Sequence, residues 1–182
     1  MGGRKKLKKI WKILNEGWTG NIFYAFLGLI FAFLFYNVIL STALGTKTPV
    51  VAVVSSSMQH DNPEVTHYKW LMEHFNYSRE FIDSWPFPNG LNVGDMPIVK
   101  GCDKYEVGDI IVYKVPGQPA PIIHRIVKIN EDGTYQTKGD NNLVQLPYEY
   151  RVKKSQIYGK VIFVIPKLGW VKVALVKILG IW

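Results

Sequence analysis

The sequence predicts a mainly β domain that follows a single N-terminal membrane-spanning helix. The first supporting observation is a stretch from Gly17 to Thr46 that contains no charged residue. The second is a series of short β-like runs between residues 96 and 165, separated by glycine, proline and aspartate. Short runs of branched and aromatic residues with turn residues at this spacing are typical of all-β domains.

The charge of the chain is concentrated before the uncharged stretch. The 182 residues carry a formal net charge of +8, with 22 basic and 14 acidic residues. Six of the basic residues precede residue 13: Arg4, Lys5, Lys6, Lys8, Lys9 and Lys12. The remaining 16 basic residues nearly balance the 14 acidic ones, so no basic surface indicates a nucleic-acid partner. The single cysteine, Cys102, allows no intramolecular disulfide.

The uncharged stretch predicts an anchor over residues 17–46, behind a basic cytoplasmic tail at 1–16. As a helix, residues 22–44 would be roughly 35 Å long, which is enough to cross a bilayer. Because the basic residues lie before this segment, we expect the N-terminus in the cytoplasm and residues 47 onward outside. The alternative is a cleaved signal peptide, since Ser41-Thr42-Ala43 resembles a cleavage site. The apolar run is long for the core of a signal peptide.

An external β domain is expected over residues 47–166, with an insertion at 59–92. Residues 48–58 have the composition of a strand that ends in a serine cluster, and residues 66–75 predict a short helix. Further strands are expected at 96–99, 109–115, 121–129, 134–138 and 157–165. Residues 167–182 are apolar with three lysines, and predict either an interfacial amphipathic segment or a helix that packs on the core.

Ser57 and His124 are the residues with the clearest potential for chemistry. Ser57 comes at the end of the apolar run that emerges from the anchor, and His124 lies among branched apolar residues of a predicted strand. A serine hydroxyl becomes a nucleophile when a base lies within hydrogen-bond reach. A solvated serine turn and a half-buried strand histidine are the alternatives.

The other histidines predict no metal site, and the sequence indicates no cofactor. His60, His67 and His74 are spaced seven residues apart, but Pro63 interrupts the helix that would align them. No histidine pair has the spacing of four residues that is common in helical zinc sites. Asn76-Tyr77-Ser78 is a glycosylation sequon on the side expected to be external.

Six motifs, taken in order, resemble those of type I signal peptidases, and in particular the histidine-type branch of archaea and the endoplasmic reticulum. They are SSSM at 55–58, GDMPIV at 94–99, VGDIIVYK at 107–114, HRIV at 124–127, TKGDNN at 137–142 and GKVIFVIPKLGWV at 159–171. The resemblance implies a β fold shared with self-cleaving LexA-type repressors. It also implies Ser57 as nucleophile, His124 as general base, and an oxyanion site formed by Ser55 and the backbone N–H of Ser57.

The acid that orients His124 is a choice between Asp140 and Glu149. A hairpin through Asp132-Gly133 would bring Asp140 back beside the strand that carries His124, so we expect Asp140 to be this acid. Relatives of this branch carry a second aspartate a few residues later, where this chain has LVQLPYEY and only Glu149. Glu149 is therefore the alternative acid.

The resemblance implies a membrane-anchored serine endopeptidase that removes signal peptides from secreted preproteins. The expected location is the cell membrane or the endoplasmic reticulum membrane, with preproteins, the lipid bilayer and the protein-export channel as partners. Ser57 follows Leu44 by 13 residues, which reach at most about 45 Å. The alternatives are a protease of narrower specificity on the same fold and a non-enzymatic anchored binding domain.

Overall fold

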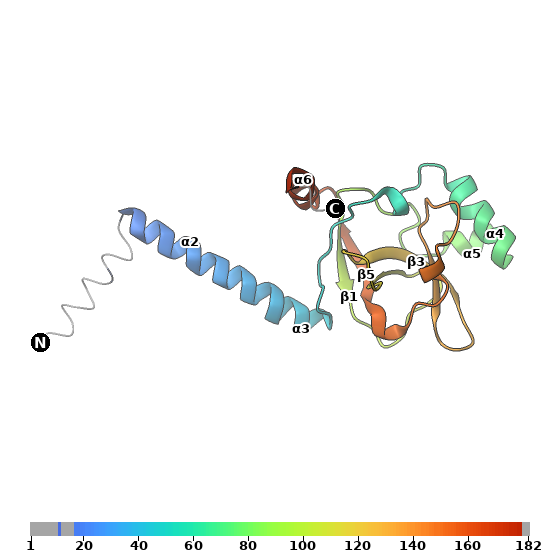
Figure 1. The fold of residues 1–182 in the computed structure, drawn as a ribbon, viewed down its shortest axis with the longest axis horizontal. Coiled ribbons are helices and arrows are strands. Elements are labelled where there is room, and N and C mark those ends of the chain that lie inside the picture. The colour runs from blue at the N-terminus through green and yellow to red at the C-terminus, as the bar shows by residue number, and fades with distance from the viewer. Residues whose placement is uncertain (1–10, 12–16, 180–182) are drawn as a thin grey trace, which may run out of the picture. The chain divides into compact units, whose positions relative to one another are not determined.

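The computed structural model describes residue 11 and residues 17–179, and it divides into two compact units, Met1–Ala43 and Leu44–Trp182 (Figure 1). The basic residues expected to form the cytoplasmic tail lie outside the described residues. The first unit is helical and the second contains a β-sheet with helices.

The first unit is a helix formed by α2 (Gly17–Leu34) and the π-helical turn η1 (Phe35–Leu40), which continues into α3 (Ser41–Leu44). Residues Gly20–Leu44 are long and apolar enough to cross a membrane, as the sequence predicted. The polar side chains near its end bond within the helix: Asn37 donates to the Phe33 carbonyl and Ser41 to the Tyr36 carbonyl. Such internal bonds lower the cost of polar groups in an apolar environment.

The second unit is built on a five-stranded antiparallel sheet with the order β1-β5-β2-β3-β4. Its strands are β1 (Met96–Lys100), β2 (Ile110–Tyr113), β3 (Ile122–Ile129), β4 (Tyr135–Lys138) and β5 (Ile157–Ile165). The first and last residues of each strand lie within two residues of those of a predicted run. The mainly β prediction is confirmed, and β3 and β4 form the expected hairpin.

The segment before the nucleophile candidate differs from the prediction of a strand over 48–58. It contributes only an isolated bridge between Val50 and Ile98, together with backbone bonds from Val51 and Val53 to β1 and the turn before it. Two short helical elements interrupt the connections that follow β4, η4 (Pro147–Glu149) and η5 (Lys154–Gln156).

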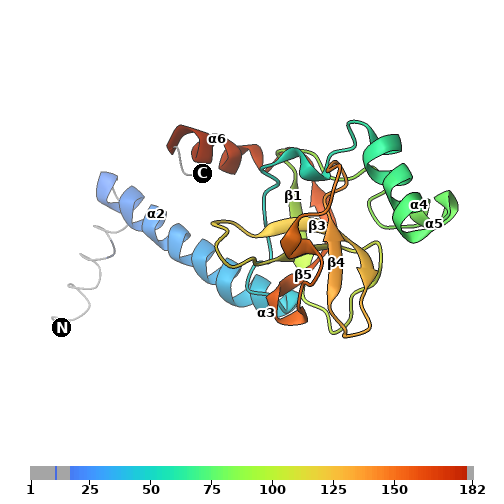
Figure 2. The same ribbon diagram turned by 45° about the vertical axis from the view of Figure 1, so that its right-hand side comes forward.

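The insertion folds as three short helical elements, η3 (Glu64–Lys69), α4 (Trp70–Phe75) and α5 (Arg79–Asp83). The first two cover the predicted helix at 66–75, and α5 was not predicted. Figures 1 and 2 both show α4 and α5 side by side at one end of the β unit. The insertion packs on the sheet through a buried cluster composed of Trp70, Leu71, Ile82, Trp85 and Val127.

The C-terminal helix α6 (Trp170–Leu179) lies at the other end of the β unit (Figure 2). Val173 is buried, whereas Val171 and Ile178 are exposed. The space beside Gly94 is filled by the Trp170 ring, because a Cβ at Gly94 would lie 2.2 Å from Nε1 of Trp170. This helix therefore contacts the domain and also presents apolar side chains to its surroundings.

Candidate active site

Ser57 lies in a single 3-10 turn, η2 (Ser56–Met58), that the core holds from one side. Met58 is buried and packs against Val53, Leu91 and Ile110. The Leu91 N–H also donates to the Met58 carbonyl at 2.7 Å. Because its neighbour is fixed in the core, Ser57 is held at the surface of the domain with its side chain partly exposed.

His124 lies in β3, opposite Ile111 of β2, and its side chain is buried. Its Nε2 lies 3.1 Å from the Oγ of Ser57. The structure thus brings together the two residues that the sequence singled out, although they are 67 positions apart.

The third member of this chain of bonds is Glu149, at the end of η4. One carboxylate oxygen, Oε1, bonds to Nδ1 of His124, and the other accepts the Leu146 N–H at 2.6 Å. Glu149 is completely buried. A carboxylate only accepts hydrogen bonds, so Nδ1 of His124 carries the proton and Nε2 is left to accept from the Ser57 hydroxyl.

The predicted pairing of Asp140 with His124 is corrected by this geometry. Within the described part of the chain, the carboxylate bonded to His124 is that of Glu149, which was the alternative acid. The expected hairpin does form, but residue 140 comes after β4 ends, and its side chain is bonded to Arg125 instead. Successive residues of a strand point to opposite faces, so the side chains of His124 and Arg125 make different contacts.

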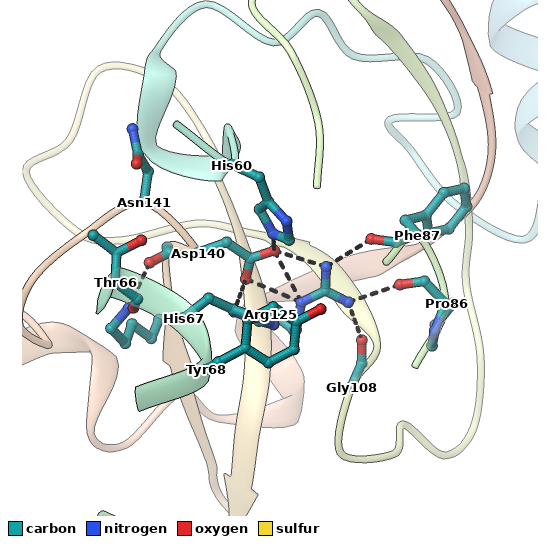
Figure 3. Close-up of polar contacts among 12 residues, drawn as sticks. His60, Thr66, His67, Tyr68, Pro86, Phe87, Gly108, Arg125, Asp140 and Asn141 are labelled. Carbon is teal, nitrogen blue, oxygen red and sulfur yellow. Dashed lines mark hydrogen bonds and ion pairs between the residues drawn. The ribbon is translucent and has the colours of Figure 1, made fainter. Parts of the chain in front are cut away.

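Asp140 lies in a buried ion pair (Figure 3). Its Oδ2 lies 2.7 Å from Nη2 of Arg125 and 3.0 Å from Nε2 of His60, and its Oδ1 lies 3.4 Å from Nδ1 of His67. Burial alone would raise the pKa of Asp140, but the Arg125 charge and the histidine bonds hold that pKa well below its ordinary value. Asp140 is therefore ionised.

A second buried cation lies beside this site. Lys138 ends β4, and its Nζ donates to the carbonyls of Thr66 and Gly139 at 2.6 and 3.0 Å. It also lies 4.9 Å from the centre of the Trp70 ring. Burial lowers the pKa of Lys138 to about 8, although the nearby Asp140 and Glu149 oppose this shift.

Ser55, the second predicted oxyanion residue, also lies close to the nucleophile candidate. Its Oγ is 3.1 Å from the Oγ of Ser57, and the side chain is exposed. Ser55 has an extended backbone just before η2, which brings the two hydroxyls to the same side.

Sequence reasoning did not identify the roles of Arg125, Lys138, His60 and His67. Both Arg125 and Lys138 stood inside a recognised motif. For Arg125 the available signal was a charged residue within an apolar strand, whereas Lys138 ends the polar run YQTK and gave no such signal. His60 and His67 gave no signal, because their common partner, Asp140, is more than 70 positions away in the chain.

Comparison with known proteins supports the family resemblance. No family model matches the chain. It is 35% identical over 81 residues to the signal peptidase complex catalytic subunit SEC11 of Scheffersomyces stipitis, and 33% identical over 97 residues to the subunit SEC11C of Rattus norvegicus. The SEC11 subunit of Eremothecium gossypii is 29% identical over 160 residues.

The chain is similar to signal peptidase catalytic subunits over part of its length. The matches to these signal peptidase subunits cover 40%, 43% and 81% of this chain, in the order given above. The same matches cover 49%, 50% and 77% of the relatives. The chain thus spans about half the length of the first curated signal peptidase subunits it matches.

Proposed function

We propose that this chain is a membrane-anchored serine endopeptidase that removes signal peptides from secreted preproteins. The observation that carries the proposal is the continuous set of bonds from Ser57 through His124 to Glu149. A nucleophile, a base and an orienting acid in this order are the arrangement used for acyl transfer. The names of the relatives, which are catalytic subunits of signal peptidase complexes, supply the substrate class.

In the proposed reaction, Ser57 Oγ attacks the scissile carbonyl while His124 Nε2 takes the hydroxyl proton. His124 then returns this proton to the leaving amine, and an acyl-enzyme forms on Ser57. A water molecule, deprotonated by the same nitrogen, attacks this ester. The bond from the acyl carbon to Ser57 Oγ then breaks, and His124 returns the proton to Oγ. Glu149 keeps the proton on Nδ1 in the resting enzyme and stabilises the imidazolium that forms during each transfer.

The oxyanion is assigned to two donors, the backbone N–H of Ser57 and the hydroxyl of Ser55. The 3.1 Å separation of the two serine Oγ atoms places the Ser55 hydroxyl beside the attacking atom. A well-placed oxyanion donor contributes about 3 kcal/mol to the stability of the transition state. The substrate would lie extended beside a strand of the domain, bound through its backbone.

The membrane supplies the remaining part of the proposal. Residues Gly20–Leu44 fit a single-pass membrane protein. The basic residues before this helix favour a cytoplasmic N-terminus and an external or lumenal β domain, in the cell membrane or the endoplasmic reticulum membrane. Such a protein meets preproteins where they leave the export channel.

The test is cleavage of several preproteins by the full chain, purified in detergent or reconstituted in vesicles. The unchanged protein should release the signal peptides, the Ser57→Ala protein should be inactive, and the Ser56→Ala protein should be active. An acylating probe should label Ser57. Cleavage of a single membrane precursor would favour the narrower protease, whereas a chain that neither cleaves nor reacts would refute an enzymatic role.

A further inference from the structure

Four side chains lie beside the proposed catalytic groups without belonging to them: the half-buried His60 and the buried His67, Arg125 and Asp140 (Figure 3). We propose that His60 and His67 are positioning residues that hold the nucleophile segment and the insertion against the Asp140 turn. This inference rests on the proposed function, because it concerns the same reaction. The residues do not touch the reacting atoms.

His60 connects the nucleophile segment to the turn after β4. It lies three residues after Ser57, and its Nε2 is 3.0 Å from Oδ2 of Asp140. The next residue of the turn, Asn141, donates its backbone N–H to the Ser57 carbonyl at 2.9 Å. Its side-chain amide donates to the Ser56 carbonyl at 3.1 Å. Two adjacent turn residues therefore hold both sides of the nucleophile.

Arg125 connects the same turn to the base. Its Nε and Nη2 donate to the two carboxylate oxygens of Asp140. Nη1 donates to the carbonyls of Pro86 and Gly108, and Nη2 also donates to the carbonyl of Phe87. Arg125 adjoins His124 in β3. A second route thus joins the nucleophile to the base, from Ser57 along the backbone to His60, then through Asp140 and Arg125 to His124. This route fixes the separation that the direct 3.1 Å bond requires.

His67 extends this network into the insertion. It is buried in η3, and its Nδ1 lies 3.4 Å from Oδ1 of Asp140. The carbonyl of the preceding residue, Thr66, accepts from Lys138. Burial lowers the pKa of His67, opposed by the bond with Asp140, so the ring is favoured as a neutral donor. The insertion is therefore bonded directly to the turn that holds Ser57.

The same groups could be considered as metal ligands, since donor atoms of His60, His67 and Asp140 lie within 4.8 Å of one another. The Arg125 contacts argue against this interpretation. The guanidinium lies 2.7–3.1 Å from both Asp140 oxygens, so the carboxylate charge is already balanced. A divalent cation would add positive charge beside a buried arginine, which carries an electrostatic cost.

The experiment compares alanine with conservative variants in the full-length protein. In His60→Ala the donor to Asp140 is lost, whereas the amide of His60→Gln can still donate. We expect His60→Ala to lower kcat for preprotein cleavage by about tenfold to a hundredfold with KM within about twofold, as small displacements of reacting groups do. His60→Gln should recover most of this loss. His67→Ala and His67→Asn form a second pair with the same expected order.

His74→Ala is the matched control, because His74 lies in the same insertion and bonds to the Trp70 carbonyl. It should cleave at the rate of the unchanged protein. Equal kcat for His60→Ala and the unchanged protein would overturn the inference, as would a His60→Gln protein no better than His60→Ala. A bound Zn²⁺ ion whose removal by EDTA slows cleavage would also overturn it.

The rate of Ser57 labelling by an acylating probe separates this inference from the proposed function. If the unchanged protein is labelled but cleaves no preprotein, the proposed function fails and the labelling rates of the variants decide the inference. Slower labelling of His60→Ala, restored in His60→Gln, would then support it. If the unchanged protein is not labelled at Ser57, both proposals are refuted.

Discussion

Glu149 combines full burial with bonds at both carboxylate oxygens, which suits a group that must orient another side chain. The Leu146 N–H fixes Oε2, so the carboxylate cannot rotate away from His124. The bond from the Leu146 N–H forms within the turn itself, because the Glu149 side chain caps η4, the helical element to which Glu149 belongs. A glutamate here reaches one methylene further than an aspartate at the same position would.

Glu149→Gln should lower kcat by about three to four orders of magnitude while the protein stays folded. The amide can donate to Nδ1, which favours the wrong tautomer of His124 and removes the charge that stabilises the imidazolium. Single-turnover cleavage of a preprotein measures the effect, with circular dichroism to confirm the fold. Glu131→Gln, at an exposed position, is the control. A Glu149→Gln protein of normal kcat would contradict the assignment.

Asp140→Asn should lower the stability of the protein. Removing one member of a buried ion pair leaves the other charge uncompensated, at a cost of about 3–5 kcal/mol. Since the folded pKa of Asp140 is below its ordinary value of 3.8, the stability it provides is present above that pH and is lost as the pH falls below it. Denaturant unfolding at pH 7 and pH 3 should therefore show a smaller gap between the two proteins at pH 3. An equal gap at both values would contradict this account.

Lys138 should make the stability of the protein rise with pH. Its folded pKa of about 8 lies below its ordinary value of 10.5, so between these values the unfolded chain binds more protons than the folded one. The penalty for burying the charge is fully present below about pH 8 and fades as the pH rises. Relative to Lys138→Met, the unchanged protein should gain at most about 3 kcal/mol between pH 7.5 and 10.5, measured by urea unfolding. A difference in the free energy of unfolding between the two proteins that does not change with pH would contradict this prediction.

At the residue scale, the sequence singled out Ser57 and His124, and it named Glu149 only as the alternative to Asp140. A serine at the end of an apolar run and a histidine inside a strand carry local signals. The position of Glu149 depends instead on a loop of eight residues after Gly139-Asp140 and on the turn η4, which returns the chain to His124. Such a return is set by tertiary packing, and neither propensity nor spacing predicts it.

Among the elements, the strands were the most predictable and the segment before Ser57 the least. β3 and β5 are runs of branched residues bounded by turn residues, so their limits follow from composition. Residues 50–54 are as apolar as a strand, and Val51, Ala52 and Val53 are buried. They pair with the sheet at one bridge only, because the chain must turn at Ser56 into η2. That turn is required by the position of Ser57 in the site, and the apolar pattern of residues 50–54 does not predict it.

The turn after β4 offers a test of how closely the elements pack at the site. A Cβ added at Gly139 would lie 2.8 Å from the Ser57 carbonyl and 2.9 Å from Nε2 of His124. Gly139→Ala should therefore push the two groups apart and lower kcat by about tenfold or more. Gly133→Ala, in the turn at the other end of β4, is the control because a Cβ there meets nothing within 4 Å. Because Gly133 has a positive φ, the Gly133→Ala protein should be slightly less stable, but its kcat should be unchanged. Preprotein cleavage by both variants, at matched folded fractions, decides the question.

For the whole molecule, the proposed activity assigns the chemistry to the β unit and the location to the apolar helix. A protease with a buried base and acid works equally well in solution. The apolar helix Gly20–Leu44 is long enough to cross a membrane, so under the proposed function the bilayer would be the place where enzyme and signal peptide meet. The exposed apolar side chains of α6, Val171 and Ile178, are those expected of an interfacial segment.

The orientation of the chain in the membrane should follow from its N-terminal charge. Six basic residues precede the apolar helix and only Lys47 follows it closely, so the positive-inside bias predicts a cytoplasmic N-terminus. Protease added to right-side-out vesicles should digest the β unit and spare a tag at residue 1. In a variant with Arg4, Lys5, Lys6, Lys8, Lys9 and Lys12 changed to Gln, part of the population should invert and expose the tag. Digestion of the tag in the unchanged protein would contradict this topology. It would also contradict the secretory role, because the β unit of an inverted protein would lie on the side of the membrane from which signal peptides have not yet crossed.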